Sequence, residues 1–150
     1  RPAEAGQVEV ELDGRAIAGV AVNTGNPHFA IFGDASRETA IALGPLLERH
    51  PAFPARANIE FVEILAPGSA ESDPYLKVTV WERGCGLTHA CGTGATAATA
   101  AALRLGLIAP ERAVHVELPG GELVIRVAPD FSEAMMEGPV AFAFSGTLAL

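Results

Sequence analysis

The residues best suited to chemistry lie in a glycine-rich loop that contains Glu82, Arg83, Cys85 and Cys91. Cys91 comes just before the Gly-Thr-Gly that opens an alanine-rich segment. Glycines there let a ligand approach the backbone, and the free N–H groups of a first helical turn favour a thiolate or a carboxylate. We expect Cys91 to have a lowered pKa and to act as a base or nucleophile. A lone cysteine beside glycine is more often a small buried residue, but Glu82 and Arg83 in the same loop favour a reactive site.

The elements on either side of this loop are expected to be a strand and a buried helix. Residues 78–81 (VTVW) are β-branched and aromatic, which predicts a strand entering the loop. Residues 95–102 contain only alanine and threonine. Alanine favours a helix, and the lack of charge predicts burial on nearly all sides. The order strand, loop, helix places Cys91 at a helix N-terminus.

The rest of the chain is dominated by short apolar segments that predict further strands. We expect these at residues 8–12, 15–22, 29–32, 57–65, 75–81, 114–118, 122–127, near 135–136 and at 141–148. Asp13-Gly14 predicts a tight turn that makes the first two a hairpin. Ser36 should cap a helix that runs to about His50, which Pro45 should divide into a short turn and a second helix. The predicted fold class is α+β, with a curved, mostly antiparallel sheet wrapped around a central apolar helix.

Composition and charge narrow the class of ligand. The chain has 150 residues, enough for one domain with a core, and its formal net charge is −8. Only ten Lys and Arg are present, which argues against nucleic acid or an anionic membrane surface and favours a small-molecule ligand. No apolar run is long enough to span a membrane and no signal pattern opens the chain, so we expect a cytoplasmic protein.

The cysteines and histidines do not have the spacing of a metal site. No metal is therefore expected. A disulfide between Cys85 and Cys91 is disfavoured in a reducing compartment. The four histidines are His28, His50, His89 and His115.

Five short motifs occur in order along nearly the whole chain. They are Gly25-Asn26-Pro27-His28, Asn58-Ile59-Glu60-Phe61, Trp81-Glu82-Arg83-Gly84 with Gly86, Ala90-Cys91-Gly92-Thr93-Gly94-Ala95, and Leu118-Pro119-Gly120-Gly121. Together they resemble the diaminopimelate epimerase family, whose members work without a cofactor in lysine and peptidoglycan precursor synthesis. The resemblance is to the second, C-terminal domain of a two-domain fold. It implies a linker at residues 1–6, one domain at 7–150 and an N-terminal domain that is absent here.

The resemblance also implies roles for particular residues. Inverting a stereocentre needs two acid/base groups flanking one carbon, and Cys91 would be one of two cysteines, the other lying in the absent domain. The chain alone is then expected to be inactive. Implied catalytic residues are Cys91, His28 and Glu82, and implied substrate-binding residues are Asn26, Asn58, Glu82, Arg83, Gly92 and Thr93. The helix N–H groups would bind the α-carboxylate, Arg83 suits a carboxylate and Glu82 an ammonium group. The resemblance implies no cofactor, and a homodimer is left open.

Three positions depart from the family pattern. Cys85 replaces another small residue, and Leu87 and His89 replace the more usual Glu and Leu. Because Cys85 shares a loop with Cys91, it should approach a substrate from the same side, so we interpret it as a small buried residue rather than the second base. His89 either tunes Cys91 or faces solvent.

Other classes of function stay open at this point. A proline racemase or hydroxyproline epimerase usually has Pro directly before the Cys-Gly-Thr-Gly, where this chain has Ala90. A cysteine acyl-hydrolase could pair Cys91 with His28 or His89 but would need an orienting group and an oxyanion hole. A non-catalytic isolated domain is the third alternative.

Overall fold

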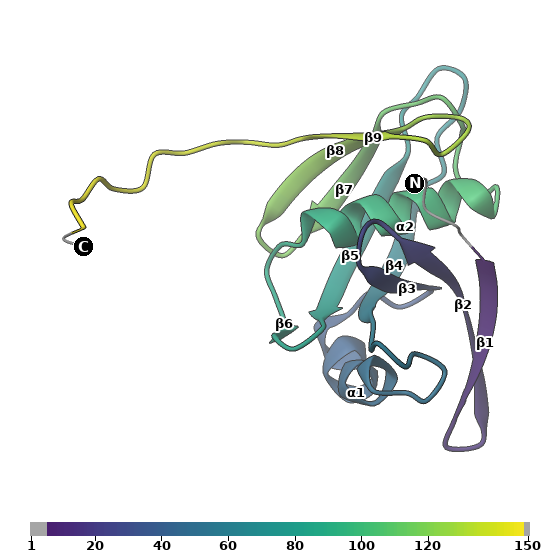
Figure 1. The fold of residues 1–150 in the computed structure, drawn as a ribbon. Helices are drawn as coiled ribbons and strands as arrows, with labels where there is room; N and C mark the ends of the chain where they lie inside the picture. Colours follow the sequence, from purple (N-terminus) through teal and green to yellow (C-terminus); the bar gives the residue numbers. More distant parts are fainter. Residues whose placement is uncertain (1–5, 149–150) are drawn as a thin grey trace.

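The computed structural model describes residues 6–148 and shows a mixed β-sheet with two helices (Figure 1). The strands are β1 (Gly6–Leu12), β2 (Arg15–Asn23), β3 (Pro27–Phe32), β4 (Asn58–Ala66), β5 (Tyr75–Glu82), β6 (Gly86–Leu87), β7 (Val114–Leu118), β8 (Gly121–Val127) and β9 (Ala134–Glu137). The helices are α1 (Arg37–Glu48) and α2 (Gly92–Arg104). The predicted α+β class is confirmed. Gly6 of the predicted linker belongs to β1, and the rest of that linker lies outside the described residues.

The nine strands form one sheet in the order β1-β2-β3-β4-β5-β7-β8-β9, with β6 paired to β5. Two of the pairings, β3 with β4 and β5 with β7, are parallel, and the other six are antiparallel. The predicted hairpin of β1 and β2 is confirmed. Asp13 and Gly14 both have positive φ values, 50° and 74°, as a two-residue type I′ turn requires.

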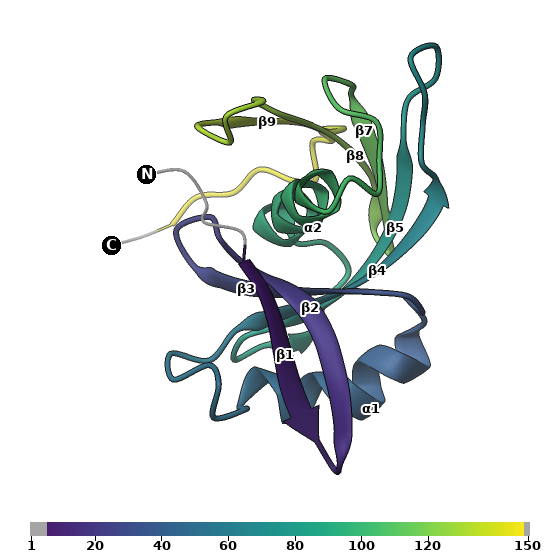
Figure 2. The ribbon, with the colours of Figure 1, turned by 90° about the vertical axis from the view of Figure 1, so that its right-hand side faces the viewer.

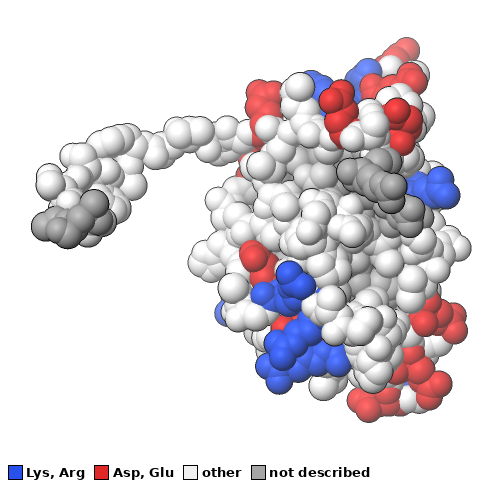
Figure 3. Space-filling model, in the orientation of Figure 1, with Lys and Arg blue, Asp and Glu red and all other residues white. Residues whose placement is uncertain are grey.

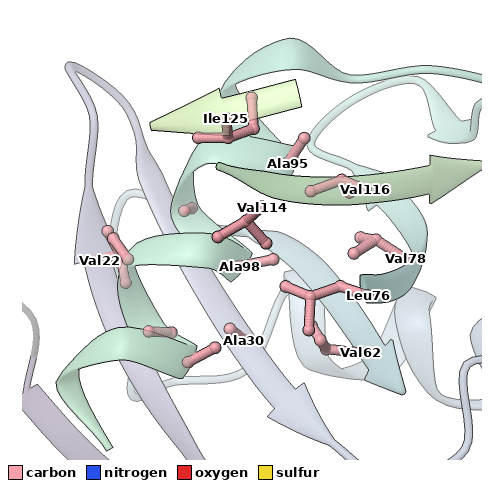
Figure 4. Packing of buried hydrophobic residues seen from close by; sticks show 14 of the residues in the cluster. Val22, Ala30, Val62, Leu76, Val78, Ala95, Ala98, Val114, Val116 and Ile125 are labelled. Carbon is pink, nitrogen blue, oxygen red and sulfur yellow. The ribbon is translucent and has the colours of Figure 1, made fainter. Parts of the chain in front are cut away.

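Helix α2 is the most deeply buried element. It contacts β2 to β5 and β7 to β9, and Figure 2 shows it between β3 and β9. Eight of its residues are buried: Gly94, Ala95, Ala97, Ala98, Thr99, Ala100, Ala101 and Ala102. Alanine side chains let apolar strand residues such as Val62, Leu76 and Val114 pack closely against the helix (Figure 4). The predicted helix and its burial are confirmed.

Helix α1 packs against β4, β5 and β6. Ser36 caps it as predicted, because its hydroxyl accepts the Thr39 N–H at 3.2 Å. The prediction that Pro45 divides this helix is wrong, since α1 is continuous from Arg37 to Glu48. Proline removes the N–H that would bond to the carbonyl of Ile41. Ile41 lies on the exposed side of the helix, where water can satisfy that carbonyl.

The predicted strand at residues 141–148 is wrong in the described structure. Residues 138–148 have no regular secondary structure and extend away from the sheet (Figure 1). Val140, Phe142 and Phe144 are 98%, 85% and 83% exposed. Alternating apolar residues favour a strand, but a strand also needs a neighbour for its backbone hydrogen bonds, and this segment has none among the described residues.

Neither described helix combines the length and hydrophobicity needed to span a bilayer.

Candidate active site

The predicted site residues come together because of the direction of three strands. β3 and β4 run parallel, with His28 opposite Asn58, and β5 runs antiparallel to β4. The starts of β3 and β4 therefore lie beside the end of β5, where Glu82 and Arg83 follow. The loop after β6 then leads to the N-terminus of α2. Residues far apart in sequence are thus collected at one end of the sheet.

Cys91 is the N-cap of α2, and its side chain is oriented by the first turn of the helix. Its Sγ accepts the Gly94 N–H at 3.4 Å and lies 3.6 Å from the Thr93 hydroxyl, while its carbonyl accepts the Ala95 N–H at 2.9 Å. Gly92 and Thr93 also lie in the first turn, where a helix provides no acceptor for the backbone N–H. These two amides are available to an anion beside the thiol.

The prediction of a lowered pKa for Cys91 is wrong for this chain. Burial raises the pKa of the thiol, and this effect outweighs the lowering by the Thr93 hydroxyl and the Gly94 N–H. A negative charge on Glu82 raises the pKa further, and an ionised Glu60 would do the same. The sequence predicts correctly that Cys91 lies at a helix N-terminus, but it does not show how far the folded chain buries the thiol, and burial decides the direction of the pKa change. Burial therefore favours the protonated thiol of Cys91 over the thiolate.

A buried histidine and carboxyl pair lies next to Cys91. His28 Nδ1 is 2.6 Å from Glu60 Oε1, and neither side chain is exposed. The position that a Cβ would take at Gly94 is 3.1 Å from Glu60 Oε1 and 3.2 Å from Cys91 Sγ. A side chain at Gly94 would therefore push against both the thiol and the carboxyl. The sequence places Glu60 in one of the five motifs but does not identify it as a site residue, because its pairing with His28 depends on the parallel register of β3 and β4.

The two predicted asparagines, Asn26 and Asn58, hydrogen-bond to residues around the His28 and Glu60 pair. Asn26 Oδ1 accepts a hydrogen bond from His28 Nε2 and another from the Thr24 hydroxyl, each at 3.0 Å. Asn58 donates its Nδ2 to the Pro27 carbonyl at 3.0 Å and accepts the Arg83 N–H at 2.9 Å. Asn58 thus ties the start of β3 to the turn after β5.

Glu82 and Arg83 are held in that turn by their own contacts. The Thr88 hydroxyl donates to Glu82 Oε1 at 2.6 Å, and Glu82 is close enough to Cys91 to affect its pKa. Arg83 is exposed, and its guanidinium donates to the Ala55 carbonyl at 2.9 Å. Arg83 is therefore an exposed member of the group, and its guanidinium is bonded to the backbone of Ala55.

The turn is supported from below by Glu48, which sequence reasoning missed. The carboxylate of Glu48 accepts the Trp81 indole N–H and the Gly84 backbone N–H, both at 3.0 Å. Gly44, one turn earlier in α1, gives Trp81 room, because a Cβ there would lie 2.5 Å from Trp81 Cγ. The only sequence signal was an acidic residue in the apolar pattern of α1.

The two remaining loop residues are both solvent-exposed. Cys85 is an exposed free thiol, so the interpretation of Cys85 as a small buried residue is wrong. The loop turns at Gly84 and Gly86, whose φ values are 81° and 84°. The His89 side chain is exposed, and its carbonyl accepts the Gly120 N–H at 2.7 Å, which links the β7–β8 turn to the loop before Cys91.

A cleft of about 330 Å³ opens over the first turn of α2. Its lining comes from the β2–β3 turn, α2 and the β8–β9 hairpin, and includes Thr24, Gly92, Thr93 and Met136. Gly92 is in close contact with Met136, whose Sδ would lie 2.8 Å from a Cβ at that position. On the face shown in Figure 3, the middle, over α2, is mostly uncharged. Within residues 6–148, no three His, Cys, Asp or Glu side chains group so that they could hold a metal ion.

The fold is an α+β domain with a buried free cysteine at the start of α2. Two solved structures share the fold. A hydroxyproline epimerase from Agrobacterium vitis has a TM-score of 0.53 and 15% identity, over 84% of this chain and 42% of that one. A PhzF-family phenazine biosynthesis protein from Bacillus anthracis has a TM-score of 0.50 and 20% identity, over 76% of this chain and 34% of that one.

Sequence comparison then identifies the family. The diaminopimelate epimerase family model matches residues 20–143. A diaminopimelate epimerase from Synechococcus sp. (strain JA-3-3Ab) is 46% identical over 93% of this chain and 48% of its own length. One from Desulforudis audaxviator (strain MP104C) is 50% identical over 84% of this chain and 43% of its own length. The chain belongs to the diaminopimelate epimerase family, and it spans about half the length of these relatives.

Proposed function

We propose that this chain supplies one half of the active site of a diaminopimelate epimerase. The reaction would convert LL-diaminopimelate to meso-diaminopimelate in lysine and peptidoglycan precursor synthesis, in the cytoplasm and without a cofactor. The observation that carries the proposal is Cys91, a thiol held at a helix N-terminus with two free amides beside it. The proposed substrate is inferred from membership of the diaminopimelate epimerase family.

The chemistry needs two groups on opposite faces of the α-carbon. One thiolate removes the α-proton, and a thiol on the other face donates its own proton to the same carbon, which leaves the stereocentre inverted and the two sulfurs exchanged in protonation. Cys91 would act as the base in one direction of the reaction and as the acid in the other. The negative charge that develops on the substrate spreads into the α-carboxylate. The N–H groups of Gly92 and Thr93 would stabilise it there.

The remaining predicted residues would bind and orient the substrate. Asn26 and Asn58 would contact its polar groups, Glu82 its ammonium group and Arg83 its distal carboxylate, provided that the Arg83 side chain turns inward from the Ala55 carbonyl. His28 would help to position the group through its contacts with Glu60 and Asn26.

The second acid/base group would come from a further domain that this chain does not contain. Cys91 can reach only one face of a carbon, and the other cysteine, Cys85, is exposed in the preceding loop. A chain that spans about half of each relative is consistent with such a two-part site.

We also propose that the sheet curves around α2. The contacts of α2 with β2 to β5 and β7 to β9 support this description of the fold.

Activity of the chain alone and of a completed chain tests the proposal. The 150-residue chain should not epimerise LL-diaminopimelate, whereas the same chain joined to the N-terminal half of the Synechococcus relative should. Cys91→Ser should abolish that activity, and Cys85→Ser, the matched control at the exposed cysteine, should retain it. Robust turnover by the chain alone, or by the completed enzyme with Cys91→Ser, would contradict the proposal.

A further inference from the structure

Glu60 is the most deeply buried carboxyl group near the site, and only one of its oxygens is paired. It lies on β4 with 0% exposure. Its Oε1 is 2.6 Å from His28 Nδ1, whereas its Oε2 is buried with no hydrogen-bond partner in the described part of the chain. Buried polar atoms are normally paired, so this one needs a physical explanation.

The other ring nitrogen of His28 shows where one proton must be. His28 Nε2 is 3.0 Å from Asn26 Oδ1, which is also the acceptor for the Thr24 hydroxyl. A carboxamide oxygen can only accept hydrogen bonds, so Nε2 must carry a proton. Two arrangements then remain for the contact between His28 and Glu60: a charged imidazolium facing a carboxylate, or a neutral ring whose Nδ1 accepts from a carboxylic acid.

The neutral arrangement fits the surroundings better. An ionised Glu60 would leave a charged Oε2 in a fully buried place without a hydrogen-bond partner among residues 6–148, which is costly. It would also place a negative charge close to Cys91, where a second one must form during proton transfer. Burial is the largest influence on the pKa of Glu60 and raises it, although the contact with His28 and the backbone N–H groups of Phe29 and Glu60 oppose the rise.

We propose that Glu60 is a positioning residue that, as a neutral acid, fixes His28 in its Nε2–H form and through it the orientation of Asn26. With Nε2–H and the Thr24 hydroxyl both bonded to its oxygen, the Asn26 carboxamide presents its NH₂ group to the substrate side. That group makes no hydrogen bond within the described residues, so it is available to donate to a substrate carboxylate. This inference rests on the proposed function for the identity of the ligand, but not for the proton positions.

The proton positions can be measured directly in the 150-residue chain. ¹⁵N NMR of labelled histidine at about pH 7 distinguishes the two neutral forms from the charged ring. We expect a neutral His28 ring with the proton on Nε2 in the wild type. Glu60→Gln can donate its amide to Nδ1 and should preserve this form, whereas Glu60→Leu should yield a mixture of the two neutral forms. A doubly protonated ring or an Nδ1–H form in the wild type would overturn the inference, whether or not the leucine variant folds.

Binding of LL-diaminopimelate to the completed chain, joined to the N-terminal half of the Synechococcus relative, tests the consequence for Asn26. Titration should shift the Asn26 side-chain amide signal in the wild type and in Glu60→Gln, and Glu60→Leu should weaken binding about tenfold. Glu63→Gln, which changes a partly buried carboxyl on the opposite face of β4, is the matched control and should bind like the wild type. Equal affinity of Glu60→Leu and the wild type would overturn the positioning role. Absence of any binding by the wild type would count against the proposed function, while the ring measurement would still decide on Glu60.

Discussion

Substituting Glu48 should loosen the turn that carries Glu82 and Arg83. Glu48 is 4% exposed, and each of its two carboxylate oxygens accepts one N–H, from the Trp81 indole and from the Gly84 backbone. A glutamine has only one side-chain oxygen. Glu48→Gln can therefore satisfy one of these donors, while its NH₂ group faces the other.

The expected loss of stability follows from these two contacts. A hydrogen bond to a charged group contributes about 1.5–3 kcal/mol, and a buried donor left without a partner costs about 1–3 kcal/mol. Glu48→Gln keeps one bond in a weaker, neutral form and orphans one donor, so we expect the free energy of unfolding to fall by about 3 kcal/mol. Glu38→Gln is the control, because Glu38 is an exposed residue in the first turn of α1, where a carboxylate contributes about 0.5 kcal/mol.

Trp81 is the sole tryptophan, which makes the measurement specific. Urea unfolding followed by tryptophan fluorescence gives the free energy, and the indole N–H signal in an NMR spectrum reports the contact with Glu48. The Trp81 hydrogen bond is the largest influence on the pKa of Glu48 and lowers it below its ordinary value of 4.5. The stabilisation is thus complete above pH 4.5 and is lost as the pH falls through the folded value. An unchanged indole signal together with wild-type stability in Glu48→Gln would refute this reasoning.

Further predictions concern Glu60, Gly44 and the C-terminal segment. Because the pKa of Glu60 is raised, Glu60 holds more proton in the native chain than in the unfolded chain above pH 4.5, so its contribution to wild-type stability should decline as the pH rises from there. Glu60→Gln should lessen that decline in a series of urea midpoints measured at different pH values. Parallel curves for the two proteins would contradict this prediction. Gly44→Ala would place a methyl group 2.5 Å from Trp81 Cγ and should cost about 1–3 kcal/mol in urea unfolding. Gly6→Ala, where a Cβ meets nothing within 4 Å, should cost little, and equal effects of the two variants would contradict the packing argument. Removing residues 140–150 should leave the thermal midpoint unchanged, since Val140 is 98% exposed, and a large drop would show that the segment packs on the domain.

Local sequence patterns predicted the elements that depend on neighbouring residues. Asp13-Gly14 predicted the first hairpin because its turn type is set by two residues. The run of alanines predicted a buried α2, and the cysteine before Gly92 predicted its start, because capping and propensity act within one helical turn. The same patterns placed the site motifs at strand ends, where the structure collects them.

What the sequence could not show depends on contacts between distant segments. Glu60 pairs with a histidine 32 residues away, and only the parallel register of β3 and β4 brings them together. The direction of the pKa change at Cys91 depends on burial by the whole fold rather than on the helix N-terminus alone. Residues 141–148 have the alternation of a strand, but that pattern carries no information on whether a neighbouring strand is present.

The most direct test of the central claim is solvent deuterium incorporation during turnover. The claim is that Cys91 is one of two acid/base groups that exchange a proton at the α-carbon. The completed chain, incubated with LL-diaminopimelate in D₂O, should form meso-diaminopimelate with deuterium at the inverted carbon, as seen by mass spectrometry and NMR, and Cys91→Ser should form none. Unlabelled meso product, or labelled product at the wild-type rate from Cys91→Ser, would contradict the assignment of Cys91 as an acid/base group.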